Sequence, residues 1–186
     1  AQAQQLSAVV TQLMDFQKSD IGKEILQLAM VDIVDFVGNR IQMFESMAAK
    51  SEIGLKFTHN TNSYSSAIDT NMMAKVVDNL ISNAIKYSSK GGIVSIGLEC
   101  DENMWRLSVT DHGIGISRQA QKHFFTEFYR SENAINSSII GSGIGLMLVK
   151  NYVELHNGKV TCEIQEGKGS VFTIEIPAAV TDRHHS

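Results

Sequence analysis

Two stretches of strictly alternating apolar and polar residues constrain the fold of this chain most strongly. In the first, 93–110, Trp105, Leu107 and Val109 alternate with polar neighbours. In the second, 159–176, the same alternation continues on either side of the turn residues EGKGS. A period of two is typical of half-buried strands, and strands joined by short turns form antiparallel hairpins. These hairpins exclude an all-parallel sheet.

Helical segments are interspersed with these strands. Apolar spacing predicts one long helix over 33–47, a second from Asp69 or Thr70 to about 88, and a third over 143–156 that ends at an Asn-Gly pair. Shorter strands are expected in EILQLAMV, LKFTHN and SYSSAID. This order predicts an α/β fold, a two-layer sandwich in which a mixed sheet of about five strands packs on three helices.

Composition narrows the class of ligand. Apolar residues make up 43% of the chain and the formal charge is −4, without the basic excess of a nucleic-acid binder. No apolar run reaches the roughly 18–20 residues of a membrane span, so no membrane contact is expected. Cys100 and Cys162 share the parity of apolar strand residues, which predicts buried free thiols in a reducing compartment. Without CxxC or clustered histidines, a zinc site has no support.

The two ends of the chain differ from its centre. Residues 1–21 carry an apolar stripe at helical spacing with no cap before it, which predicts the last turns of a helix whose beginning is missing and whose stripe needs a partner. The chain does not begin with Met, and we expect it to be part of a longer protein. The central domain is predicted to span 22–179, followed by a tail or added residues at 180–186.

The helix that ends near residue 88 has two distinct faces. Asn79, Asn83 and Lys86 line up at i, i+4 and i+7, apart from the predicted core stripe of Val77, Leu80, Ile81 and Ala84. A plain solvated face is one interpretation. Asn is only a middling helix former, so its use twice in five residues favours a ligand face. Amide oxygens can ligate Mg²⁺, and a lysine suits phosphate.

The first of two glycine clusters follows a predicted strand and reads DHGIGIS. Gly113 and Gly115 are expected at positive φ, where the backbone can approach a ligand closely, and Asp111 can accept a hydrogen bond from an amino group. The alternative is an Asx turn that closes a hairpin.

The second cluster, GSGIGL, opens the third helix. Gly141, Gly143 and Gly145 place free N–H groups and the positive end of the helix dipole where an anion could bind. A loop with close helix packing is equally compatible. Neither cluster is a P-loop or a dinucleotide fingerprint. Between them, the aromatic KHFFTEFYR and the polar SENAINSSII suggest an anchored lid, or else a plain surface loop.

Four motifs in order give the chain a specific resemblance. NLISNAIKYS, DHGIGI, FFTEFYR and GSGIGL, across Asp78 to Leu146, resemble the N, G1, F and G2 boxes of the catalytic and ATP-binding domain of sensor histidine kinases. That domain has the Bergerat fold of the GHKL superfamily, shared with type II topoisomerase, mismatch-repair and chaperone ATPases. The preceding residues resemble the end of the second helix of a dimerisation and phosphoacceptor hairpin, and VTQLMDFQKSDIGK is similar to hybrid sensor kinases.

The resemblance implies ATP and Mg²⁺ as ligands and assigns roles to matching positions. Asp111 would bind the adenine amino group, Asn83 would ligate Mg²⁺ with support from Asn79, and Arg130 would contact the γ-phosphate. Lys86 and Tyr87 would contact phosphate or ribose, and the second glycine cluster would hold the phosphate chain. The nucleotide-binding positions implied in this way are Asn79, Asn83, Lys86, Tyr87, Asp111, Gly113, Gly115, Ile116, Phe128, Gly141, Ser142, Gly143, Ile144, Gly145 and Leu146.

The implied activity is that of a protein histidine kinase, with Asn79, Asn83, Lys86 and Arg130 as the catalytic set. Related ATPases carry a glutamate base where this chain has Asn79. An amide cannot deprotonate water, which favours phosphoryl transfer to histidine over hydrolysis. The implied partners are a dimerisation and phosphoacceptor domain, a second copy in the parent protein and a downstream response regulator receiver. The implied location is the cytoplasmic part of a membrane-bound sensor.

The histidines give no acceptor site. The family's acceptor motif, H-[ED]-x-[RK]-[TN]-P, is absent around each of them, so the chain is expected to hold only the ATP half of the reaction. His112 is interpreted as a residue at the rim of the pocket. His156, at the end of the third helix, is expected to be a cation that suits the helix dipole.

Two other functions stay open. One is an ATP-driven conformational machine of the topoisomerase or chaperone type, against which Asn79 and the short lid argue. The other is a degenerate nucleotide-binding scaffold that works through its N-terminal helix, against which the four intact boxes argue.

Overall fold

The computed structural model describes residues 25–113, 144–165 and 167–178. A five-stranded sheet in the order β2-β4-β5-β7-β6 forms one layer. Its strands are β2 (Gly54–His59), β4 (Ile93–Cys100), β5 (Met104–Asp111), β6 (Lys159–Gln165) and β7 (Gly169–Pro177). β2 and β4 are parallel and the other neighbours antiparallel, which confirms the mixed sheet and its hairpins.

A second, smaller sheet lies beside the first. β1 (Leu28–Asp32) and β3 (Ser65–Asp69) pair antiparallel, with Leu28 opposite Asp69. The segment SYSSAID therefore does form a strand, but it leaves the main sheet to pair with β1, and its last residue begins the next helix.

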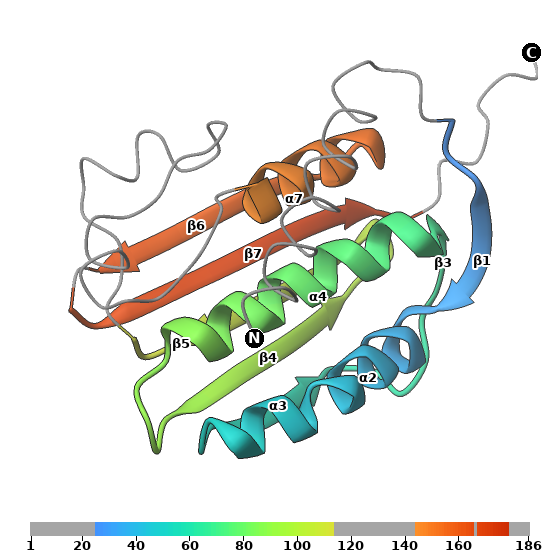
Figure 1. Ribbon diagram of the computed structural model, residues 1–186. Coiled ribbons are helices and arrows are strands. Elements are labelled where there is room, and N and C mark those ends of the chain that lie inside the picture. Colours follow the sequence, from blue (N-terminus) through green and yellow to red (C-terminus); the bar gives the residue numbers. More distant parts are fainter. Residues whose placement is uncertain (1–24, 114–143, 166, 179–186) are drawn as a thin grey trace, which may run out of the picture.

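The helices cover one face of the main sheet (Figure 1). They are α2 (Ile33–Met43), α3 (Glu45–Lys50), α4 (Thr70–Tyr87) and α7 (Ile144–Leu155). The prediction of one helix over 33–47 was wrong, because the Phe44 N–H bonds to Ile41 O at 3.0 Å, a tight i−3 turn that ends α2. No glycine or proline marks this break, so apolar spacing alone could not locate it. Among the described residues, no helix is long and apolar enough to cross a membrane.

The core lies between this helical layer and the sheet. Trp105 is fully buried and its Nε1–H donates to Ser66 Oγ at 3.3 Å. The predicted core stripe of α4 is confirmed, since all four of its residues are at most 4% exposed. Cys100 and Cys162 are free but only half-buried, contrary to expectation, because one ends β4 and the other lies on the edge strand β6. Burial raises the pKa of both thiols.

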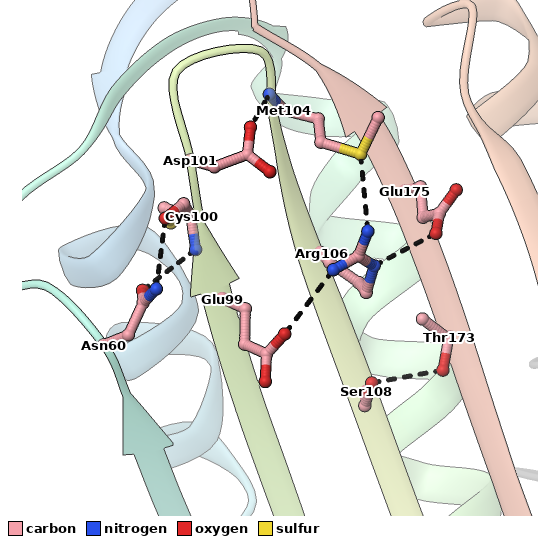
Figure 2. A network of polar contacts seen from close by, with 9 residues as sticks. All are labelled: Asn60, Glu99, Cys100, Asp101, Met104, Arg106, Ser108, Thr173 and Glu175. Atoms are coloured by element: carbon pink, nitrogen blue, oxygen red, sulfur yellow. Dashed lines mark hydrogen bonds and ion pairs between the residues drawn. The ribbon is translucent and has the colours of Figure 1, made fainter.

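The opposite face of the sheet is polar (Figure 2). Arg106 Nε donates to Glu175 Oε1 at 3.0 Å, and Arg106 Nη1 lies 3.5 Å from Glu99 Oε2. Ser108 and Thr173 are hydrogen-bonded across β5 and β7 at 3.1 Å. The bond from Arg106 holds the pKa of Glu175 below its usual value. A face of cross-strand polar pairs needs no second helical layer, which explains the two-layer architecture.

Helix α4 is tied to α2 by an ion pair. Arg40 Nε donates to Asp78 Oδ1 at 2.8 Å, and a second bond joins Nη2 to Oδ2. Planar, two-pronged contacts of this kind fix direction as well as distance. Asn79, the first residue of NLISNAIKYS, directly follows Asp78. The ion pair therefore fixes the rotation of α4 about its axis at this position.

The end of α7 follows the Asn-Gly prediction. Asn157 lies at φ 58, and the N–H groups of Asn157 and Gly158 bond to Glu154 O and Val153 O, both at 2.9 Å. This pattern is a Schellman motif. The expected cation at His156 was wrong. His156 Nε2 accepts from a backbone N–H, so this nitrogen carries no proton and the ring is neutral.

The side chain that starts α2 allows a stability test. Asp32 Oδ1 accepts from Val34 N at 2.9 Å and Oδ2 accepts from the Ser63 hydroxyl at 2.6 Å. We expect Asp32→Ala to lower the free energy of unfolding by about 1–2 kcal/mol, the usual cost of losing a helix cap. Asp32→Asn, which keeps one acceptor, should cost less. Urea unfolding followed by the fluorescence of Trp105, the only tryptophan, measures both.

This contribution should depend on pH. The hydrogen bond from Ser63 lowers the pKa of Asp32, so its stabilisation is present above the ordinary pKa of aspartate and is lost as the pH falls through the lowered value. The difference between wild type and Asp32→Ala should shrink over that interval. A constant difference would contradict the assignment.

Candidate functional site

A buried carboxylate ends the central strand β5. Asp111 is 4% exposed. Its Oδ1 accepts from the Gly113 N–H at 3.0 Å and its Oδ2 accepts from the Ser170 hydroxyl at 2.5 Å. The backbone N–H of Ser170, its partner across β5 and β7, is a further donor.

The protonation of Asp111 reflects two opposing effects. Burial raises its pKa, while the bonds from Ser170 and Gly113 lower it, and burial is the larger effect. An ionised carboxylate offers about four acceptor positions. Three are filled by described residues, which leaves one position among them for a hydrogen bond from a ligand amino group.

Gly113 is required by a close contact and not by its backbone angles. The expectation that it adopts positive φ was wrong, because positive-φ glycines among the described residues are Gly91, Gly167 and Gly169. A Cβ on Gly113 would instead lie 1.7 Å from Tyr87 O. Gly113 therefore lies against the last turn of α4, where the face of Asn79, Asn83 and Lys86 ends.

Ser170 is a site residue that the sequence analysis missed. It was placed in the turn EGKGS, whereas β7 begins at Gly169. Gly169 lies at φ 117, and a Cβ there would be 2.2 Å from Asp111 O, so bare backbone lets β7 reach the end of β5. Only the register of β5 with β7 shows that Ser170 lies opposite Asp111, and no short-range pattern in the sequence contains that register.

The polar face of α4 leads toward this carboxylate. Asn79 and Asn83 are half-buried and Lys86 is exposed, so the face is not simply solvated. Asn79 Nδ2 donates to Lys75 O at 2.7 Å, a bond that directs its side chain along the helix. The described residues hold no group of three or more His, Cys, Asp or Glu side chains that could bind a metal. A cation here would be held by amide oxygens together with oxygens of a ligand.

The start of α7 lies at the same end of the molecule. α4 and α7 pack side by side and run in opposite directions (Figure 1). Because the N–H of Asp69, before α4, bonds to His156, after α7, the two helices are aligned at that end, and the C-terminal half of the 18-residue α4 lies beside the first turn of the 12-residue α7. That turn contains Gly145, which is buried, and Leu146, which is half-buried. The structure thus brings together the end of β5, the end of α4, the start of α7 and the start of β7.

Several predicted site residues lie outside the described residues. Residues 114–143 connect Gly113 to Ile144, and both of these residues lie at the site end of the fold. His112 is exposed beside Asp111, and its role at a pocket rim stays a prediction. The predicted helix within 1–21 and the predicted tail 180–186 also lie outside the described residues. The predicted site residues that lie outside them are Gly115, Ile116, Phe128, Arg130, Gly141, Ser142 and Gly143.

The contact between Gly113 and Tyr87 can be tested by adding one methyl group. Gly113→Ala should lower the free energy of unfolding by about 1–3 kcal/mol or more, since the backbone of α4 or β5 must move. Gly97→Ala is the matched control, because its Cβ would meet nothing closer than Thr58 Oγ1 at 3.8 Å. We expect the control to stay within about 1 kcal/mol of wild type. Equal losses in urea unfolding would contradict the close contact.

The hydroxyl of Ser170 should tune the acidity of Asp111. Ser170→Ala removes a donor that stabilises the ionised carboxylate, so the pKa of Asp111 should rise further above its ordinary value. An NMR titration of the Asp111 carboxyl carbon measures this directly. Thr173→Ala, on the polar face of β7, is the control and should leave that titration unchanged.

Comparison with known proteins agrees with this geometry. Residues 68–180, more than half of the chain, match the family described as histidine kinase-, DNA gyrase B- and HSP90-like ATPase. The sensor-like histidine kinase SenX3 of Mycolicibacterium smegmatis is 30% identical over 100% of this chain and 48% of its own length. The chain thus spans about half the length of the curated relatives it matches.

Solved structures share the fold. The Acinetobacter baumannii histidine kinase AdeS superposes with a TM-score of 0.77 at 24% identity, over 95% of this chain and 80% of its own. Histidine kinase ThkA, in complex with its response regulator protein TrrA, gives 0.74 at 23% identity, over 97% of this chain and 50% of its own. By fold, by motif order and by the extent of the family match, this chain belongs to the histidine kinase-, DNA gyrase B- and HSP90-like ATPase family.

Proposed function

We propose that this chain is the ATP-binding catalytic module of a two-component sensor histidine kinase, which uses Mg·ATP to phosphorylate a histidine on a separate dimerisation domain. The observation that carries the proposal is Asp111, a buried carboxylate with one acceptor position to spare in a chain of an ATPase family. In this assignment 22–179 forms the module, 1–21 ends the phosphoacceptor hairpin and 180–186 is a tail.

Asp111 would select the adenine base. Its remaining acceptor position suits the exocyclic amino group, a donor that guanine does not present at the same place. Charge-assisted hydrogen bonds to buried carboxylates are stronger than those between neutral groups. Gly113 and Gly115 would leave bare backbone beside the base, with Ile116 and Phe128 as apolar neighbours.

The polar face of α4 would hold the metal and the phosphates. Mg²⁺ usually keeps few protein ligands and is bound mainly through phosphate oxygens and water, so a half-buried amide such as Asn83 fits it without a carboxylate cluster. Bound there, the ion supplies neutralisation of phosphate charge. Asn79 would orient this ligand, and Lys86 and Tyr87 would contact phosphate or ribose.

The start of α7 would hold the phosphate chain. The first turn of a helix has N–H groups without intrahelical partners and the positive end of the dipole. Gly145 and Leu146 lie in that turn. Gly141, Ser142, Gly143 and Ile144 would complete the cradle, and Arg130 would contact the γ-phosphate.

Transfer would go to nitrogen and not to water. The unprotonated imidazole nitrogen of the acceptor attacks the γ-phosphorus, the bond to the bridging oxygen breaks, and ADP leaves. An imidazole nitrogen needs no base to remove a proton before it attacks, whereas water does. Asn79 cannot act as such a base, so catalysis would rest on positioning and charge neutralisation.

The proposed partners follow from the relatives. One solved neighbour is described as histidine kinase ThkA in complex with response regulator protein TrrA. For this chain we propose, by analogy, a phosphoacceptor domain of the same protein, a second copy of it, and a response regulator receiver downstream. The corresponding location is the cytoplasmic side of a sensor.

ATP binding provides the direct test. The chain should bind a fluorescent ATP analogue in the presence of Mg²⁺, with ATP as competitor, and Asp111→Asn should weaken binding about 10- to 150-fold, as expected for losing a charged hydrogen bond of roughly 1.5–3 kcal/mol. Ser108→Ala, on the polar face of β5, is the control and should bind as wild type does. No binding near millimolar nucleotide by folded protein would contradict the proposal.

The acceptor separates the kinase from its alternatives. With a phosphoacceptor hairpin supplied separately, the module should transfer the γ-phosphate of labelled ATP to histidine, while it hydrolyses ATP only negligibly alone. Steady turnover without the hairpin would favour a conformational ATPase instead. Binding without transfer would favour a scaffold.

A further inference from the structure

A buried histidine joins the two site-bearing helices at the end far from the site. His156 is 7% exposed and follows α7 directly. Its Nε2 accepts from the Asp69 N–H at 3.0 Å and its Nδ1 lies 2.7 Å from Tyr152 O. Because an amide N–H only donates, the ring proton is on Nδ1 and is donated to Tyr152 O. Both ring nitrogens are therefore used.

The partner of His156 is itself fixed. Asp69 is 5% exposed and is the N-cap of α4, where its Oδ1 accepts from Met72 N at 3.1 Å. Its Oδ2 accepts from Gln27 N at 3.0 Å. The imidazole thus connects the end of α7 to a residue that is held on two other sides.

Packing and this hydrogen bond constrain α7 in different ways, since α7 also contacts α4, β6 and β7. The face between α4 and α7 is apolar, with Val149 and Val153 fully buried. Apolar burial depends on area and is non-directional, whereas a hydrogen bond is lost when its donor and acceptor move apart by less than 1 Å. A hydrogen bond at the end of the helix therefore adds a directional constraint on the register of α7 to the constraint from packing.

A shift of α7 at its His156 end would also move its first turn, at the site. α7 has 12 residues, and a helix of that length is about 18 Å long and moves as one rigid element. Displacement of His156 along the axis moves Gly145 and Leu146 by the same amount. Asp111 and the end of β5 belong to the sheet and do not follow.

We propose that His156 is a positioning residue for the nucleotide site, whose neutral imidazole sets the place of the α7 start relative to the C-terminal half of α4. This rests on the proposed ATP site. His156 touches no ligand and acts through α7 on the groups that would hold the phosphate chain.

Three substitutions separate positioning from general stability. His156→Leu removes both hydrogen bonds, and His156→Asn keeps a polar side chain that suits a helix end but is too short to reach from Tyr152 O to the Asp69 N–H. His156→Gln offers an acceptor and a donor at greater reach and serves as the conservative rescue. Asp32→Ala, which weakens α2 and touches neither helix, is the control for lost stability.

The measurement is the dissociation constant for ATP with Mg²⁺, by competition with the fluorescent analogue, on protein shown to be folded by Trp105 fluorescence. We expect His156→Leu and His156→Asn to raise it about 5- to 30-fold, within the usual range for coupling between distant sites, and His156→Gln to stay within about threefold of wild type. The Asp32→Ala control should bind as wild type does while it unfolds at lower urea.

The outcomes distinguish the two proposals. Wild-type affinity in folded His156→Leu would overturn the positioning role alone, and so would an equal loss in Asp32→Ala. If His156→Leu does not fold, His156→Asn decides by the same criterion. A wild-type chain that binds no ATP would overturn the proposed function and this role together.

Discussion

The pairing of β5 with β7 is the constraint on which the site depends. It places Ser170 opposite Asp111, so that a carboxylate can be buried with its charge matched by donors from its own sheet. Burying an ionised carboxylate without such donors would cost several kcal/mol. The pKa of Asp111 is nevertheless raised, which means that desolvation exceeds these hydrogen bonds. A further hydrogen-bond donor from a ligand would offset part of that desolvation.

Strands β5 and β7 carry charged groups in two different environments, an ion pair on the solvent face and a buried carboxylate at the end of β5. On the solvent face, Arg106 lowers the pKa of Glu175, in a pair that water screens and that adds little to stability. At the end of β5, Asp111 forms no salt bridge among the described residues, and its hydrogen-bond donors are a hydroxyl and backbone N–H groups. A cation beside it would fill the acceptor position that a ligand needs. The solvent face of these strands therefore holds paired charges, whereas the end of β5 holds a carboxylate bound only by uncharged donors.

The sequence predicted those parts of the fold that repeat along the chain. Alternation located the hairpins, and helical spacing located α4 and its core stripe, because burial imposes both periods directly on the residues. Prediction from the sequence failed at positions whose conformation depends on a single contact. The break at Phe44 depends on one backbone N–H, and Gly113 is glycine because Tyr87 O lies against it, not because of its φ. Ser170 was missed because strand register is a relation between segments 59 residues apart. The roles of the individual site residues stay predictions.

Asp69 shows how the fold separates the two ends of its helices. At that end, one residue caps α4, accepts from Gln27 just after 1–24, and donates to His156. Because hydrogen bonds are directional, these three bonds together allow Asp69 few alternative positions. At the other end, the described contacts are close approaches of bare backbone around Asp111, with 114–143 joining β5 to α7. The hydrogen bonds of Asp69 and the close contact of Gly113 with Tyr87 therefore constrain opposite ends of α4.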